Sequence, residues 1–169
     1  MTLHLVEPFP PSWVPRLWCW LHECPESNFA DDAPTTFAAF ATEIEQRQRL
    51  ERTWGIVVDD EPAGYIGYLP ITTRLGSLHG ICLAGAVCHR GLGKIALTQA
   101  LESVWASGVE KVCATFFNDN LAVSAMLRRV GFCEEGLLVD HVVRDGQPVS
   151  MRIVAMFKPV PIVLKERVS

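Results

Sequence analysis

The stretch of sequence that decides the fold runs from Leu78 to Gly108 and reads LHGICLAGAVCHRGLGKIALTQALESVWASG. Its first portion, Leu78 to Val87, is an apolar run of the kind that forms a buried strand. A loop with two glycines follows, and beyond it apolar residues recur at helical spacing at positions 97, 100, 101 and 104. Gly108 suits the position just past the end of this helix. The order of strand, glycine loop and helix predicts an anion site at the start of the helix.

The loop Arg90-Gly91-Leu92-Gly93-Lys94 has the features that bind a phosphate. Backbone amides in the first turn of a helix are unpaired and lie at the positive end of the helix dipole. Glycine has no Cβ to block the approach of an anion, and Arg90 and Lys94 add positive charge. Taken by itself, the Gly-Leu-Gly sequence could also form an ordinary turn between a strand and a helix. The pattern Gly91-x-Gly93-x-x-Ala96 also fits a dinucleotide fingerprint, but the loop lies in mid-chain and no acidic residue ends the next strand.

Upstream of this stretch the sequence predicts one strand, two helices and a hairpin. They are strand Leu3 to Val6, helices with apolar faces from Trp13 to Cys24 and from Phe37 to Ile44, and strands Trp54 to Val58 and Ala63 to Ile71. Pro34 suits the first turn of the second helix. The segment Glu43 to Arg52 loses its apolar stripe, which predicts a solvated helix end on the surface. Aromatic residues of the two helices are expected in the core in preference to an acceptor pocket: Trp13, Trp18, Trp20, Phe37 and Phe40.

Downstream the sequence predicts a strand, a helix and a second hairpin. They are strand Val112 to Phe117, a helix with the stripe Val123, Met126, Leu127 and Val130, and strands around Phe132 to Val143 and Val149 to Phe157. The fold class is therefore α/β (α+β), a mixed and mostly antiparallel sheet of about seven strands with one parallel pair around the glycine-loop helix. We expect one domain over residues 1–169, with an N-terminal strand and helices in residues 1–52, a core in residues 53–132, a C-terminal hairpin in residues 133–158 and a tail in residues 159–169.

Composition and charge argue against several classes of protein. A net charge of -4 and a pI near 5.7 speak against nucleic-acid binding, which depends on clustered Lys and Arg. No apolar run approaches the ~20 residues that span a bilayer and no secretory signal is visible, so we expect no membrane contact and a cytoplasmic protein. Cys19, His22 and Cys24 lack a second pair at zinc-finger spacing, so we expect no metal. The sequence is compatible with a homodimer and does not decide the oligomeric state.

Residues 54 to 157 resemble the GNAT superfamily of acyl-CoA-dependent N-acetyltransferases. Arg90 and Gly93 fill the first and fourth positions of the family's pyrophosphate signature, R/Q-x-x-G-x-G/A, and Ile95 stands at the sixth. The segment from Asn120 to Phe132 matches the family's pattern of an asparagine, a short helix and a terminal Gly-Phe. The continuation Glu134-Glu135-Gly136-Leu137, followed by the hairpin at Asp145-Gly146, resembles the branch acting on protein N-termini and small amines. The resemblance implies acetyl-CoA as the acyl donor and a primary amine as the acceptor.

The resemblance also implies where acetyl-CoA is held. In the family the pantetheine arm pairs with the strand before the glycine loop, and a backbone amide there polarises the thioester carbonyl. That role falls on Leu83, Ala84, Gly85, Ala86 and Val87. The other expected cofactor-binding residues are Arg90, Gly91, Leu92, Gly93, Lys94, Ile95 and Asn120.

Two catalytic candidates follow from the same resemblance. The family often places a glutamate base eleven residues before the loop arginine, where this sequence has His79. An amine like that of lysine is protonated at neutral pH, and a free imidazole with a pKa near 6.5 is suited to remove its proton. A hydrogen-bonded core histidine is the alternative. Many members protonate the thiolate with a tyrosine on the asparagine helix, where this sequence has Leu127, and Ser124 is the candidate that could hold a water.

Two other functions stay open at this point. The missing glutamate and tyrosine are compatible with a catalytically silent CoA-binding module. The glycine pattern is compatible with a dinucleotide-binding enzyme.

Overall fold

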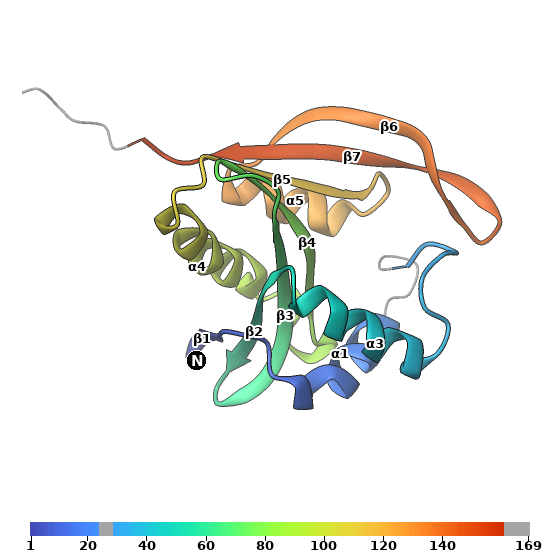
Figure 1. The fold of residues 1–169 in the computed structure, drawn as a ribbon, viewed down its shortest axis with the longest axis horizontal. Coiled ribbons are helices and arrows are strands. Elements are labelled where there is room, and N and C mark those ends of the chain that lie inside the picture. Colours follow the sequence, from blue (N-terminus) through green and yellow to red (C-terminus); the bar gives the residue numbers. More distant parts are fainter. Residues whose placement is uncertain (24–28, 161–169) are drawn as a thin grey trace, which may run out of the picture.

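The computed structural model describes residues 1–23 and 29–160, and its strands form one seven-stranded sheet in the order β1-β2-β3-β4-β5-β7-β6 (Figure 1). The strands are β1 (Leu3–Val6), β2 (Arg52–Val58), β3 (Glu61–Pro70), β4 (Leu75–Leu83), β5 (Lys111–Phe117), β6 (Cys133–Arg144) and β7 (Gln147–Phe157). The helices are α1 (Val14–His22), α3 (Phe37–Gln48), α4 (Leu92–Ala106) and α5 (Leu121–Val130), and short 3-10 turns are η1 (Pro11–Trp13) and η2 (Gly85–Val87). Only β4 and β5 pair in parallel among the described strands, so the predicted fold class is confirmed.

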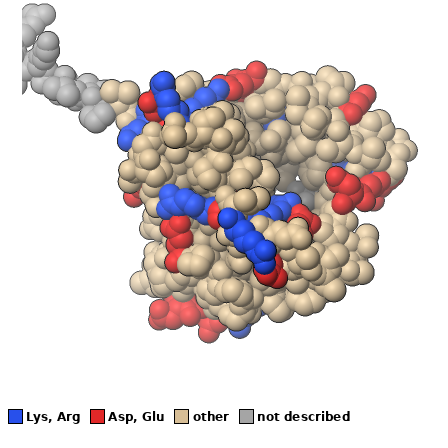
Figure 2. Space-filling model, in the orientation of Figure 1, with Lys and Arg blue, Asp and Glu red and all other residues tan. Residues whose placement is uncertain are grey.

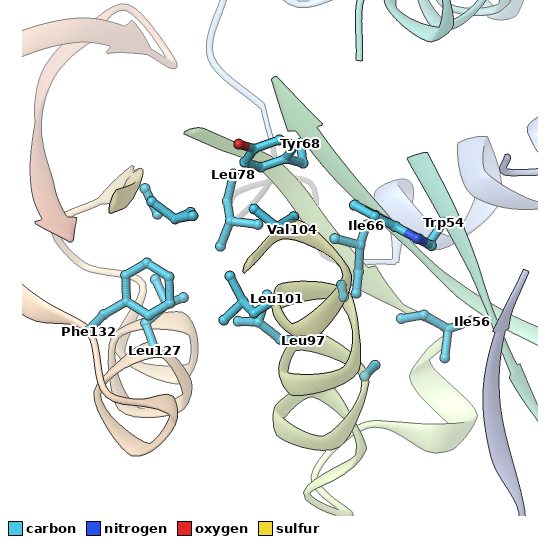
Figure 3. Close-up of a cluster of buried hydrophobic side chains, with 14 of the residues drawn as sticks. Trp54, Ile56, Ile66, Tyr68, Leu78, Leu97, Leu101, Val104, Leu127 and Phe132 are labelled. Carbon is cyan, nitrogen blue, oxygen red and sulfur yellow. The ribbon is translucent and has the colours of Figure 1, made fainter. Parts of the chain in front are cut away.

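Helices cover both faces of the sheet, and alternate residues of a strand contribute to the two cores. On β3, Ile66 packs in the core that contains α4 and α5, whereas its neighbour Tyr65 packs in the core that contains α1 and α3. Figure 3 shows the first core, in which Leu97 and Leu101 of α4 lie between the sheet and Leu127 of α5. The central strands of the sheet are therefore buried on both faces.

Three local expectations need correction. Helix α3 begins at Phe37 and not near Pro34, because the Thr36 hydroxyl caps it by accepting a hydrogen bond from the amide of Ala39 (3.3 Å). The segment expected as a solvated helix end is not all on the surface, since the Glu51 side chain is only 4% exposed. The strand expected from Leu78 to Val87 ends at Leu83.

The long hairpin of β6 and β7 reaches over to the loop that precedes α3 (Figure 1). The amide of Asp31 donates to the carbonyl of Val143 (2.8 Å). In return, the Asp31 carboxylate accepts hydrogen bonds from the amides of Asp145 (2.7 Å) and Gly146 (2.9 Å) in the hairpin turn. These bonds tie the hairpin to the helical side of the molecule.

The surface carries charges of both signs. In the space-filling view, Lys and Arg side chains lie beside Asp and Glu, and the face is hollowed between the hairpin and the helices α1 and α3 (Figure 2). No helix within residues 1–23 and 29–160 is long and apolar enough to span a membrane.

Candidate active site

The site begins where the two parallel strands separate. Strands β4 and β5 pair from Leu75 with Lys111 to Leu78 with Ala114. Beyond Leu78, β4 continues to Leu83 along β3, whereas β5 continues to Phe117 along β7. The second halves of the two strands thus have different neighbours, and a gap opens between them.

His79 is a bulge residue at the point of separation. Tyr68 of β3 pairs with Leu78 and Gly67 pairs with Gly80, so His79 has no partner in the ladder. A bulge turns its extra residue out of the regular alternation of side chains. The imidazole is 40% exposed, so the alternative of a buried core histidine does not fit the structure.

A buried carboxylate lies behind this imidazole. The Glu51 Oε1 atom is 3.1 Å from His79 Nδ1. Gly67 leaves room for the carboxylate, because a Cβ at that position would lie 3.2 Å from Glu51 Oε2. Among the described residues, Oε2 is buried without a hydrogen-bond partner. A carboxylate at Nδ1 favours the tautomer with its proton there, which leaves Nε2 as the acceptor of a proton.

Tyr65 supplies a hydroxyl on the same strand as Gly67. Its oxygen would lie 2.6 Å from a Cβ at position 67, and its side chain lines the cavity that His79 also lines. Burial raises the pKa of the Tyr65 hydroxyl well above its usual range, and the nearby Glu51 carboxylate raises it further. The hydroxyl therefore stays protonated and can donate a hydrogen bond to a bound molecule.

Two cavities lie on the two sides of the gap. The first has a volume of about 410 Å³ and is lined by α1, the loop before α3, α3, the separated strands, α5 and the hairpin strands. The second has a volume of about 440 Å³ and is lined by the end of β4, the glycine loop and α5. Ile81 of β4 and Val123 of α5 line both cavities. The two cavities are therefore adjacent, and His79 lies on the wall of the first.

The glycine loop places the start of α4 at the wall of the second cavity. Gly91 precedes α4 with φ +76°, a left-handed conformation that glycine adopts without strain, and no side chain caps the helix. The first amides of α4 are thus left for an anion. Lys94 and Arg129 line this cavity and add positive charge.

Gly93 has a second reason to be glycine. A Cβ there would lie 2.8 Å from Met126 Sδ and 3.4 Å from Leu83 Cδ1. Its absence lets α4, α5 and β4 approach each other at the cavity wall.

The structure brings together some of the predicted cofactor-binding residues. Those that line the second cavity are Leu83, Gly91, Leu92, Gly93 and Lys94. Asn120 lines the first cavity and caps α5, accepting a hydrogen bond from the amide of Val123 (3.1 Å). Predicted residues that line neither cavity are Ala84, Gly85, Ala86, Val87, Arg90, Ile95 and Ser124.

The chain leaves the sheet after Leu83, and the cofactor-binding role of the residues that follow stays a prediction. Residues Gly85–Val87 form the 3-10 turn η2 and cannot present a strand edge. The amide of Gly85 donates to the Glu23 carboxylate (2.6 Å), and the amide of Val87 donates to the carbonyl of Ala84 (3.0 Å). An extended surface before the loop is thus limited to the end of β4, up to Leu83.

Sequence reasoning missed several residues of the site. Glu51 and Tyr65 stand beside or near His79, and Arg129 lines the second cavity. Tyr65 and Gly67 carry a signal in the sequence, because a large and a small residue two apart on a strand lie on one face. The sequence around Glu51 carries no such signal, since this residue follows a polar helix end. Of the expected core aromatics, Phe40 is buried but also lines the first cavity.

Comparisons with known proteins find a matching family and solved structures of similar fold. The model of the Acetyltransferase (GNAT) family matches residues 14–132. An acetyltransferase from Salmonella typhimurium that modifies the N-terminal serine of ribosomal protein L7/L12 has a TM-score of 0.78 at 21% identity, over 94% of this chain and 96% of its own. The ribosomal-protein-S18-alanine N-acetyltransferase from Escherichia coli has a TM-score of 0.73 at 15% identity, over 96% of this chain and 99% of its own.

A third solved structure carries a ligand. It is a ribosomal L7/L12 alpha-N-protein acetyltransferase in complex with coenzyme A, with a TM-score of 0.78 at 20% identity, over 93% of this chain and 94% of its own. At such identities the solved structures show a common fold. The comparison with curated proteins gives no match. Because the family model covers most of the chain, this protein belongs to the GNAT family of N-acetyltransferases, enzymes that transfer an acetyl group from acetyl-CoA to an amine.

Proposed function

We propose that the second cavity takes the coenzyme A moiety of acetyl-CoA and that the first cavity takes the amine acceptor. The observation that carries this assignment is that the two cavities are adjacent at Ile81 and Val123, with His79 on the acceptor side. Acetyl-CoA supplies the acetyl group as a thioester that an amine can attack. The described strands lie in one sheet, so we also propose a single acyltransferase domain.

The glycine loop would hold the pyrophosphate. The uncapped first turn of α4 offers backbone amides, and Lys94 offers a charge beside them. Arg129 faces the same cavity from α5 and would contact another phosphate of the cosubstrate. Arg90 lines neither cavity. The hydrogen bond from the Thr2 amide lowers the pKa of the Asp59 carboxyl, and the charge of Arg90 adds a smaller effect in the same direction.

His79 would act as the base. Its Nδ1 atom faces Glu51, so Nε2 is the atom that takes a proton from the acceptor ammonium, directly or through a water. The Glu51 carboxylate would then stabilise the imidazolium. The proton transfer leaves the free amine in the first cavity, next to the point where the two cavities are adjacent.

Leu127, whose side chain cannot donate a proton, stands at the position of the family's tyrosine acid. Leu127 lines the first cavity there and is 2% exposed. A thiolate with a pKa near 8.5 is a fair leaving group without an acid. We propose that the thiolate leaves without a dedicated acid from α5.

The assignment of the second cavity predicts a selective response to ligands. Acetyl-CoA and CoA at ~100 times their dissociation constants should stabilise the folded protein by about 2.7 kcal/mol, whereas NAD and ATP should not. Thermal denaturation with each ligand measures this difference. Stabilisation by NAD alone would instead support a dinucleotide-binding protein.

A further inference from the structure

Apolar residues form a large part of the wall of the first cavity, and polar and charged residues form the rest. Its volume of about 410 Å³ lies in the range of small-molecule sites. Apolar residues of several elements line it: Leu21 of α1, Phe29 of the following loop, Phe40 of α3, Val142 of β6 and Met151 of β7. The hydrogen bonds of Asp31 hold the loop and the hairpin together around this space. An apolar group placed here would lose its contact with water on several sides.

The charges on the walls suit one ammonium group and disfavour several. Glu43 forms an ion pair with Arg47 four residues later, so their charges compensate each other. Asp32, also on the wall, is exposed and lies outside this pair. A second or third ammonium group would meet the Arg47 guanidinium or the apolar walls, and burying an unpaired charge is costly.

We infer that the acceptor is a primary amine joined directly to an uncharged, largely apolar group, and that polycationic amines are poor substrates. The inference rests on the proposed assignment of the first cavity to the acceptor. Both a peptide with an apolar first residue and a small free amine carry this chemistry. The apolar group would pack against Phe29, Val142 and Met151, while the amine lies near His79.

Acceptor preference tests the inference directly. The panel pairs peptides beginning with Leu or Phe against the same peptides beginning with Lys or Asp, and phenethylamine against spermidine and an aminoglycoside. We expect kcat/KM to be at least about tenfold higher for the apolar member of each pair, the range that apolar contacts give. Activity with the peptides but not with phenethylamine would assign the site to protein N-termini, and the reverse would assign it to small amines. A polycation as the best acceptor would overturn the inference.

A pair of neighbouring substitutions links the preference to this cavity. Val142 lines the cavity, whereas Val143 does not and is 49% exposed. Val142→Glu should lower kcat/KM for the Phe peptide about tenfold, because a carboxylate is added to an apolar part of the wall. The difference in kcat/KM between the Phe peptide and spermidine should therefore become smaller. Val143→Glu should leave kcat/KM for the Phe peptide and for spermidine within about twofold of the wild-type values. An equal effect of the two changes, or none from Val142→Glu in a folded protein, would contradict the inference.

The outcomes separate this inference from the proposed function. If no acceptor is acetylated although CoA binds, the proposed function fails. If polycations are acetylated and apolar amines are not, the proposed function stands and the inference fails.

Discussion

Replacing His79 with alanine should lower kcat for acetyl transfer about 100- to 10,000-fold, the usual contribution of a positioned base. The acidic limb of the pH profile should disappear, because that limb reports protonation of the base. Affinity for CoA should change by less than about twofold, since His79 lines the first cavity and not the second. Initial rates from pH 6 to 9, with calorimetric titration of CoA, measure both effects.

Glu51→Gln is the matched comparison for this variant. It keeps the size of the side chain and removes the charge that faces His79 Nδ1 at 3.1 Å. We expect a smaller loss of kcat, about tenfold, because the imidazolium formed on His79 loses its counter-charge. A merely structural role of the pair would lower the melting temperature and leave the pH profile in place. Unchanged rates and profile in a folded His79→Ala protein would remove His79 from the mechanism.

Gly93→Asp should weaken CoA binding about 100-fold. The new carboxylate would stand at the first turn of α4, where the proposed pyrophosphate site needs backbone amides and no negative charge. Gly93 lines the second cavity together with Leu83 and Met126, so the side chain would also take up space there. Calorimetric titration with CoA measures the change.

The control for this variant is Gly93→Ala. Its Cβ would lie 2.8 Å from Met126 Sδ, an atom of a flexible side chain that can move aside. We expect Gly93→Ala to fold and to keep CoA affinity within about fivefold. A folded Gly93→Asp protein with undiminished affinity would move the phosphate site away from this loop.

The elements that sequence predicts best are those with a local cause. Helix α4 follows its glycine loop and ends near Gly108 because periodicity and glycine act over a few residues. Asn120 caps α5 and Gly131, with φ +121°, ends it for the same reason. The seven-stranded sheet and its parallel pair also follow from the order of these elements.

The catalytic surroundings depend on contacts that local patterns do not contain. His79 leaves the ladder because of the register between β3 and β4, and the register depends on residues of both strands. Glu51 is buried beside Gly67, a residue sixteen positions later in the sequence that leaves it room. The turn at Gly85–Val87 uses the carboxylate of Glu23, which lies 62 positions earlier in the sequence. Contacts between residues so far apart in the sequence are recognised only in the folded structure.

Acetyl transfer itself is the measurement that tests the central claim most directly. The wild-type protein is incubated with acetyl-CoA and a Phe-initiated peptide, and mass spectrometry follows the peptide while free thiol is titrated. We predict that the peptide gains one acetyl group on its α-amine, that one CoA thiol appears for each peptide modified, and that His79→Ala protein at the same concentration gives far less of both. Firm binding of CoA with no acetylated product from any amine of the panel would contradict the account.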